Sequence, residues 1–538
     1  MALSWLGSAA RSMFYLVSPW DLALDDSDPA PQILLRQGIP MFFFFIVLEA
    51  VFVAARRRAG FALQPLTPRS HPAPKFETHP RYRLNDTVTC IMLGSLQRLG
   101  ELLLELLGLT LHVSAYRVVY TRCRLLDFSP KDHVLLCYVA LLLGKDLAYY
   151  WAHRLMHEYH AVWLTHSVHH SGQDYNMGTG LRQGVAQPLF TWLFYLPFAL
   201  LGFHPHAFAA HAQLNTLYMF WIHTDLVDRL PAGLEYVLLL LLLLLLLLLL
   251  LLLLLTTRQV LSLVILLTRN YSISLLCLLL STKPTRYVLN SPMAHRMHHR
   301  PPGNCNYAGV FIFWDRLFGT YRAERERRDW FGLAAPPQTF DLAVLNSQHA
   351  AKLTRATMSS KNKQQQQQQQ QPASWGRWLL ARRVPARWTC SFGALLEPIP
   401  PSEGDRRAEG PANPGKVWDG AGPMLPGTAT NVALASLMTV AGAFALLLKS
   451  KDMHRLDALV ATLLAAALML MVCRACDQQE APRASASRAL ASCALLLPVL
   501  AFFVAAQPAA RFAATTAWVA QVTAQVKTLS GLLSKIKK

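Results

Sequence analysis

Acidic residues are scarce in this sequence of 538 residues. There are 31 Asp and Glu against 51 Lys and Arg, and only 15% of the chain is charged while 53% is hydrophobic. This balance argues against a soluble globular protein. A net charge of +20 would suit a nucleic-acid-binding surface, but no nucleic-acid-binding module accompanies it, so we expect no nucleic acid partner. The charge fits basic loops on the cytoplasmic side of a membrane, such as residues 56–58 and 535–538.

Cysteines are few and scattered. The nine are odd in number and show no spacing typical of a disulfide framework. Cys473 and Cys476 form a C-x2-C pair, but no redox fold is indicated around them, so we interpret the pair as incidental. The N-terminus lacks the basic stretch and clean apolar core of a cleavable signal peptide, and we therefore expect the first membrane span to direct targeting.

Long apolar runs are abundant instead. About 20 apolar residues cross the hydrocarbon core of a bilayer. Several runs are short or contain polar residues, so re-entrant or interfacial segments stay open as alternatives. The predicted fold class is an all-α, polytopic membrane helical bundle. The candidate runs are 39–55, parts of 87–112, 134–152, 186–203, 207–222, 237–255, 261–280, 431–448, 458–473 and 489–506.

Histidines are concentrated in two places. Of the 19 in the chain, six fall within residues 153–170 and three within 295–299. The spacings are H-x3-H once and H-x2-H-H twice, and residues i, i+3 and i+4 share one face of a helix. One metal ion takes roughly four to six ligands, so eight such imidazoles predict a site for two ions, although imidazole alone does not name the metal. The eight are His153, His157, His166, His169, His170, His295, His298 and His299.

Three further polar residues lie in apolar runs. His223 ends such a run, where an unpaired imidazole is costly, so we predict it as a ninth metal ligand. Asp146 shares a helix face with His153 and His157, and a buried carboxylate there would hold a metal-bound histidine in place. An ordinary aspartate at the membrane interface is the alternative. His211 is a candidate to support a ligand in the same way.

Two stretches differ in composition from the rest. Residues 238–255 are eighteen consecutive leucines, and the tripeptide YVL occurs on both sides of the tract. We interpret 239–289 as an insertion, whose translation could displace the last histidine set. Residues 351–420, with eight consecutive glutamines, are predicted to be disordered. The predicted organisation is an N-terminal segment at 1–38, a membrane catalytic domain at 39–345, a linker at 346–430 and transmembrane helices at 431–538.

The histidine sets and the segments between them resemble the fatty acid hydroxylase superfamily of membrane di-iron enzymes. Within it the sequence is most similar to the glyceryl-ether (alkylglycerol) monooxygenases, over roughly residues 13–345 without the insertion. The linking segments make the resemblance more specific than the histidine spacings alone. The segments that carry it include DLAYYWAHRLMHE, THSVHHSGQDYN, HAQLNTLYMFWIHTD, NSPMAHRMHH and NYAGVFIFWDRLFGTY.

The resemblance implies residue roles and chemistry. The eight histidines would fill three histidine boxes and bind two iron ions. Glu158 would occupy an acidic position needed for activity, with a solvated glutamate at a helix end as the alternative, and His160 has no counterpart. The implied reaction uses O2 and tetrahydrobiopterin to hydroxylate the ether-linked carbon of a 1-alkylglycerol or lyso-alkyl phospholipid. The product would collapse to a fatty aldehyde and a glycerol derivative, at the cytoplasmic rim of the endoplasmic reticulum membrane.

Two other functions stay open. One is a fatty-acid or sterol hydroxylase or desaturase that receives electrons through cytochrome b5. The other is a non-enzymatic zinc transporter or metal-binding scaffold. A transporter should carry acidic residues or histidines in the middle of its spans, whereas here the histidines gather at helix ends.

Overall fold

The computed structural model describes residues 2–58, 82–127, 129–227, 288–301, 303–324, 331–333, 337–351 and 426–476. Within these ranges every named element is helical, and the one strand-like feature is a bridge between Leu289 and Phe311. The predicted all-α class is confirmed. The elements are α1 (Ala2–Met13), α2 (Pro19–Leu22), the π-helix η1 (Leu34–Gly38), α3 (Ile39–Arg58), α4 (Leu84–Leu106), α5 (Leu111–Cys123), α6 (Val134–Glu158), α7 (His160–His166), the 3₁₀ helices η2 (His169–Ser171) and η3 (Met177–Leu181), α8 (Pro188–Thr191), η4 (Trp192–Tyr195), α9 (Leu196–Leu200), α10 (Pro205–Trp221), α14 (Pro292–His298), α15 (Phe313–Leu317), α19 (Pro426–Lys449), η6 (Ser450–Asp452) and α20 (Arg455–Cys476).

Three helical stretches in the described residues are long and apolar enough to cross a membrane. They are Leu34–Arg56, Val134–Glu158 and Arg455–Cys473. The spans predicted at these three places are confirmed. Large apolar side chains on α3, such as Val47 and Val51, are more than half exposed, as expected for a helix that faces lipid. The chain is therefore a multi-pass membrane protein.

The other predicted runs have different outcomes. The run at 186–203 does not form one span, because Pro188 and Pro197 each begin a new short helix. The run at 87–112 is divided at Gly108, whose φ of 72° ends α4 before α5 begins. The helix at 207–222, α10, has 17 residues and is shorter than a bilayer span, and within the 24 residues of α19 the apolar stretch is Ala435–Leu448. The runs at 237–255, 261–280 and 489–506 lie outside the described residues.

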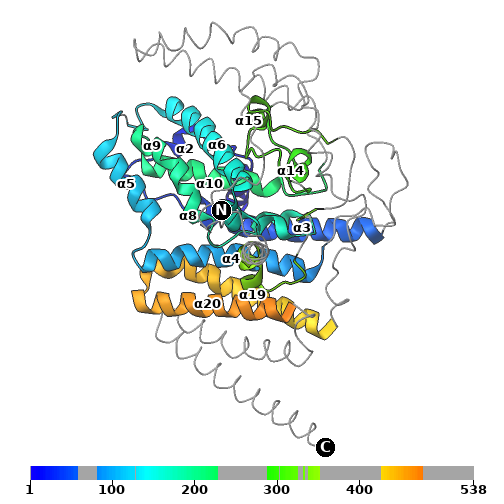
Figure 1. Ribbon diagram of the computed structural model, residues 1–538. Coiled ribbons are helices and arrows are strands. Elements are labelled where there is room, and N and C mark those ends of the chain that lie inside the picture. Colours follow the sequence, from blue (N-terminus) through cyan, green and yellow to red (C-terminus); the bar gives the residue numbers. More distant parts are fainter. Residues whose placement is uncertain are drawn as a thin grey trace, which may run out of the picture.

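Two clusters of buried apolar side chains hold these helices together. One lies where α4 packs against α19 and α20, three helices that run side by side in Figure 1, and it includes Leu93, Leu99 and Leu468. The other joins α1, α3, α6 and α10 through residues such as Leu214 and Leu217. The end of α6, the end of α7 with η2, and the short α14 carry the histidines.

The described residues bear on the predicted domain boundaries in only two places. The segment interpreted as an insertion, 239–289, lies almost entirely outside them. The helix α14, which follows that segment in the sequence, lies with the other histidines. The predicted linker from residue 346 begins as helix, which continues to residue 351.

Candidate metal centre

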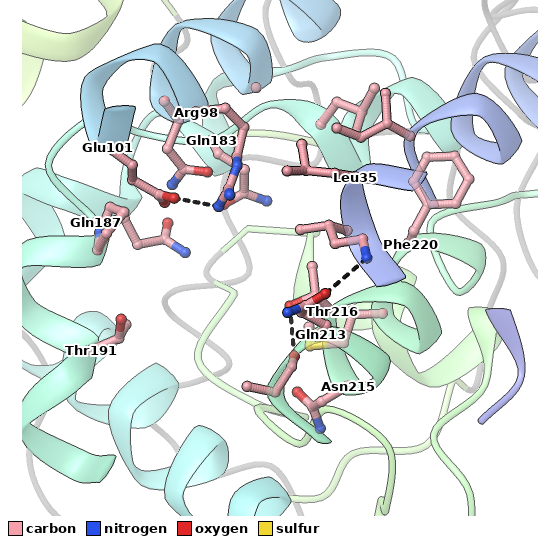
Figure 2. A pocket seen from close by; sticks show the side chains of 18 of the residues that line it. Leu35, Arg98, Glu101, Gln183, Gln187, Thr191, Gln213, Asn215, Thr216 and Phe220 are labelled. Carbon is pink, nitrogen blue, oxygen red and sulfur yellow. Dashed lines mark hydrogen bonds and ion pairs between the residues drawn. The ribbon is translucent and has the colours of Figure 1, made fainter. Parts of the chain in front are cut away.

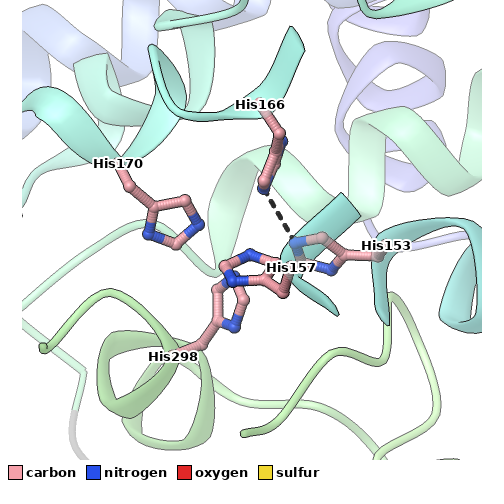
Figure 3. Close-up of side chains that lie close together, drawn as sticks. All are labelled: His153, His157, His166, His170 and His298. Carbon is pink, nitrogen blue, oxygen red and sulfur yellow. Dashed lines mark hydrogen bonds between the residues drawn. The ribbon is translucent and has the colours of Figure 1, made fainter. Parts of the chain in front are cut away.

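Nine histidines converge in two adjacent groups. In the five-histidine group, one ring nitrogen from each residue lies within 4.8 Å of the others (Figure 3). The four-histidine group meets the same limit, and all nine side chains are buried. The nine residues predicted as metal ligands are thus brought together from α6, α7, η2, the end of α10 and α14. The five-histidine group is His153, His157, His166, His170 and His298; the four-histidine group is His169, His223, His295 and His299.

Histidines four positions apart share a group. This holds for His153 with His157, for His166 with His170, and for His295 with His299. Each H-x2-H-H set was expected to face one way, and that expectation is wrong. His169 and His298, the i+3 members of their sets, each cross to the other group. Each H-x2-H-H set therefore contributes histidines to both groups.

Four of the rings are oriented by backbone carbonyl groups. Their Nδ1 atoms lie 2.7–3.0 Å from a carbonyl oxygen. A carbonyl oxygen only accepts, so Nδ1 carries the proton and Nε2 keeps its lone pair. Outer partners of this kind fix the tautomer and direction of metal-bound histidines. The pairs are His153 with Tyr307, His169 with Arg182, His223 with Met219, and His298 with Cys305.

The Nε2 atoms then meet inside the groups. Those of His153 and His166 are 3.0 Å apart, and those of His223 and His295 are 2.9 Å apart. In the described part of the chain, Nε2 of His170 and of His298 is buried and has no hydrogen-bond partner. A buried polar atom without a partner is costly, and a cation among these nitrogens removes that cost. These two atoms belong to the five-histidine group. In the four-histidine group the ligand atoms also lie within 4.8 Å of one another, so the residues present fit a metal ion in each group.

Four histidines of the two groups that lie outside the membrane spans are held neutral. Burial lowers the pKa of His169 to about 4. Burial, reinforced by neighbouring histidines, also lowers the pKa of His170, His295 and His299 well below the usual range. A metal ligand must be a neutral imidazole, so burial prepares these side chains for binding at neutral pH.

Asp146 does not hold a histidine, contrary to the prediction. Its carboxylate accepts hydrogen bonds from the backbone N–H groups of Val310 and Phe311, at 2.7 and 2.8 Å, and from the Asn215 amide at 2.9 Å. Gly309 permits this contact, because a Cβ there would lie 2.6 Å from the carboxylate. Asp146 therefore fastens the segment after α14 to α6 and α10, and acts on the site only through that segment.

Glu158 lies at the end of α6, directly after His157. It is buried rather than solvated, and its Oε1 accepts from Arg154 Nε at 2.7 Å. His160 lies outside both groups, where its Nδ1 is 3.2 Å from His349 Nε2. His211 does not support a ligand either, because its Nδ1 is 2.6 Å from the Tyr15 hydroxyl.

A shell of buried ion pairs surrounds the groups, and the sequence interpretation missed it. Arg182 pairs with Asp86 at 3.2 Å, which fastens the polar segment after His170 to α4. Arg296, which lies between the histidines of α14, pairs with Asp225 at 3.4 Å and with Glu324. Two features of the sequence could have indicated the Arg296 ion pair: an arginine inside a histidine set, and an aspartate two residues after His223.

We expect Arg296→Met to destabilise the protein by about 3–5 kcal/mol, because two buried carboxylates lose their shared cation. Thermal unfolding of the full chain in detergent measures this as a lower melting temperature. Arg36→Met is the matched control on an exposed arginine, with an expected effect within about 0.5 kcal/mol. Equal melting temperatures for both variants would contradict a stabilising role for the Arg296 pairs.

A cavity of about 600 Å³ opens beside the two groups. His166, His169 and His223 form part of its wall. Gln183, Gln187, Thr191 and other polar side chains lie around it, and Arg98 pairs with Glu101 on one side (Figure 2). The rest of the wall is largely apolar and comes from η1, α3, α4, α10 and α19. Such a cavity suits a molecule with a polar end and a long apolar chain.

Comparison with known proteins agrees with this arrangement. The family described as fatty acid hydroxylase matches residues 138–240 and 230–320. The alkylglycerol monooxygenase of Homo sapiens is 30% identical over 342 residues, which is 63% of this chain and 59% of that protein. The proteins of the same name from Xenopus tropicalis and Danio rerio are 29% and 30% identical, over 58% and 57% of their lengths.

The chain therefore spans less than two thirds of the length of these curated relatives. No solved structure matches it. The family match covers α6, the end of α10 and α14, and so includes all nine histidines of the two groups. Across residues 138–320 the chain is similar to the fatty acid hydroxylases, and the resemblance predicted from its histidine sets is confirmed.

Proposed function

We propose that this protein is an ether-lipid monooxygenase. It would hydroxylate the ether-linked carbon of 1-alkylglycerols and lyso-alkyl phospholipids, which then break down to a fatty aldehyde and a glycerol derivative. The observation that carries the proposal is the pair of buried histidine groups that open, through His166, His169 and His223, into a cavity with polar and apolar walls. The names of the relatives support the choice of an alkylglycerol as substrate.

The proposed metals are two iron ions, one in each histidine group. An unactivated C–H bond needs an oxidant stronger than any side chain, and bound iron with O2 supplies that chemistry. The protein ligands would be neutral imidazoles, with Glu158 the nearest carboxylate in sequence. Tetrahydrobiopterin as electron donor and the endoplasmic reticulum membrane, with the site at its cytoplasmic rim, complete the proposal and rest on the resemblance.

The cavity's own residues would position the lipid. The amides of Gln183 and Gln187 and the Thr191 hydroxyl offer hydrogen bonds to a glycerol headgroup. Phe42 and Phe220, whose ring centroids are 4.2 Å apart, belong to the apolar wall that would hold the alkyl chain and keep water away. This arrangement would place the junction between headgroup and chain, the ether carbon, beside the histidines.

The test is an assay of 1-alkylglycerol cleavage by the full chain with tetrahydrobiopterin, compared with reduced cytochrome b5 as electron source. Fatty aldehyde that forms only with the pterin is the expected result. Hydroxylation or desaturation of a fatty acid or sterol driven by cytochrome b5 would favour the other enzyme class. Zinc transport into vesicles without O2 consumption would contradict an enzymatic function.

The helix α19 should limit the length of the alkyl chain. Its residues Val440, Ala443, Phe444 and Leu447 lie on one helix face and form one wall of the cavity. We expect Ala443→Trp to lower kcat/KM for a hexadecyl ether relative to an octyl ether by roughly tenfold or more, since each excluded methylene loses about 0.8 kcal/mol. Leu437→Trp, at an exposed position of the same helix, is the control. An equal loss for both chain lengths would contradict this role.

A further inference from the structure

Two cations in the cavity wall have no ion-pair partner among the described residues. Its charged lining residues are Arg98, Glu101, Arg117 and Lys145. Arg98 and Glu101 pair with each other. Among the described residues, neither Arg117, at an exposed position, nor Lys145 has an ion-pair partner within 4.0 Å. A ligand that carries negative charge would complete this lining.

Lys145 is the more informative of the two cations because it is buried, with 3% of its surface exposed. Its ammonium group lies 4.6 Å from the ring centroid of Tyr195 and 5.6 Å from that of Tyr149. Such contacts compensate only part of the cost of a buried charge. The adjacent Asp146 carboxylate interacts with Lys145 electrostatically but forms no ion pair with it within 4.0 Å, because its oxygens accept from Asn215 and from the backbone after α14.

Tyr149 links Lys145 to the candidate metal centre. The Tyr149 ring contacts the Lys145 ammonium group, and its centroid also lies 5.2 Å from the ring centroid of His153. Lys145 is therefore separated from the five-histidine group by one aromatic ring. Lys145 and Tyr149 both line the cavity, as do His166, His169 and His223 of the two histidine groups.

We propose that Lys145 binds the phosphate of a single-chain ether lipid, so that the cavity prefers a 1-alkylglycerol 3-phosphate to an uncharged 1-alkylglycerol. This inference rests on the proposed function, because it assigns the headgroup of the same ether lipid. The phosphate sits beside Lys145, near the hydroxyl groups of Tyr149 and Tyr195. The ether carbon then faces the histidines, and the alkyl chain follows the apolar wall toward α19.

The experiment measures equilibrium binding of two radiolabelled lipids to the full chain in detergent under anaerobic conditions. The lipids are 1-O-hexadecylglycerol and 1-O-hexadecylglycerol 3-phosphate, and the result is the ratio of their affinities. We expect Lys145→Met to lower the preference for the phosphate lipid by about tenfold to a hundredfold, the range for one lost charge-assisted hydrogen bond. Lys145→Arg should keep most of the preference. Lys131→Met, an exposed lysine paired with Asp25 and Asp28, should leave the ratio unchanged.

Three results would overturn the inference. One is a wild-type protein without preference for the phosphate lipid. Another is an unchanged ratio in a Lys145→Met variant that melts like the wild type. The third is competition by inorganic phosphate as effective as competition by the lipid, which would show a free-anion site. Binding needs no turnover, so a Lys145-dependent preference in a protein that cleaves neither lipid would refute the proposed function and leave this inference standing.

Discussion

Replacing His166 with alanine is expected to abolish cleavage of 1-alkylglycerols while the protein stays in the membrane. His166 contributes a nitrogen to the five-histidine group and also lines the cavity. Loss of a group that merely orients a metal ligand costs about 10–100-fold in metal affinity or activity, so loss of a ligand should exceed about a hundredfold. The measurement is aldehyde formation together with the iron content of the purified variant, and both should fall.

His160→Ala is the matched control for this experiment. His160 lies six residues away on the same helix, α7, but faces His349 and belongs to neither group. We expect its activity and iron content to stay within about twofold of the wild type, as for a substitution that touches no ligand. Normal turnover in His166→Ala, or an equal loss in both variants, would contradict the assignment of the ligands.

Asp146→Ala is expected to have the second large effect. It should lower the stability of the protein, and the loss of stability should in turn lower its activity. Two backbone N–H groups and the Asn215 amide would lose their shared buried acceptor. Each unsatisfied buried donor costs about 1–3 kcal/mol, so the loss should exceed about 3 kcal/mol. The segment after α14 would then detach from α6, and with it the carbonyl of Tyr307 that orients His153. Melting temperature and iron content should fall together.

Asp132→Ala provides the comparison at an exposed aspartate, with little expected change in either quantity. The two readouts separate a positioning role from a direct chemical one. A variant Asp146→Ala that melts like the wild type and binds two metal ions, yet has no activity, would show that Asp146 acts in the reaction itself.

Local spacing predicted much of the site. The i, i+4 rule placed His153 with His157 and His295 with His299, because neighbouring turns of one helix bring such residues together whatever surrounds them. The cost of an unpaired imidazole in an apolar run identified His223. The confirmed membrane spans followed from length and hydropathy in the same way.

Tertiary structure decided the rest. His169 and His298, the i+3 members of their sets, join a different group from the i and i+4 members, and the spacing alone does not decide this. Asp146 shares a helix face with His153, yet its partners come from residues 215, 310 and 311, which only the folded chain brings near. The Arg296 ion pairs and the position of Lys145 in the cavity could not be predicted either, because they too depend on residues that are distant in the sequence.

The metal content of the purified full chain tests the central claim most directly. Elemental analysis of protein prepared with iron should give two iron ions per chain. The variants His170→Ala and His299→Ala, one from each group, should each lose about one ion if the groups bind independently. A wild-type protein with one ion or none, or one that holds only zinc, would contradict a di-iron centre built from the two histidine groups.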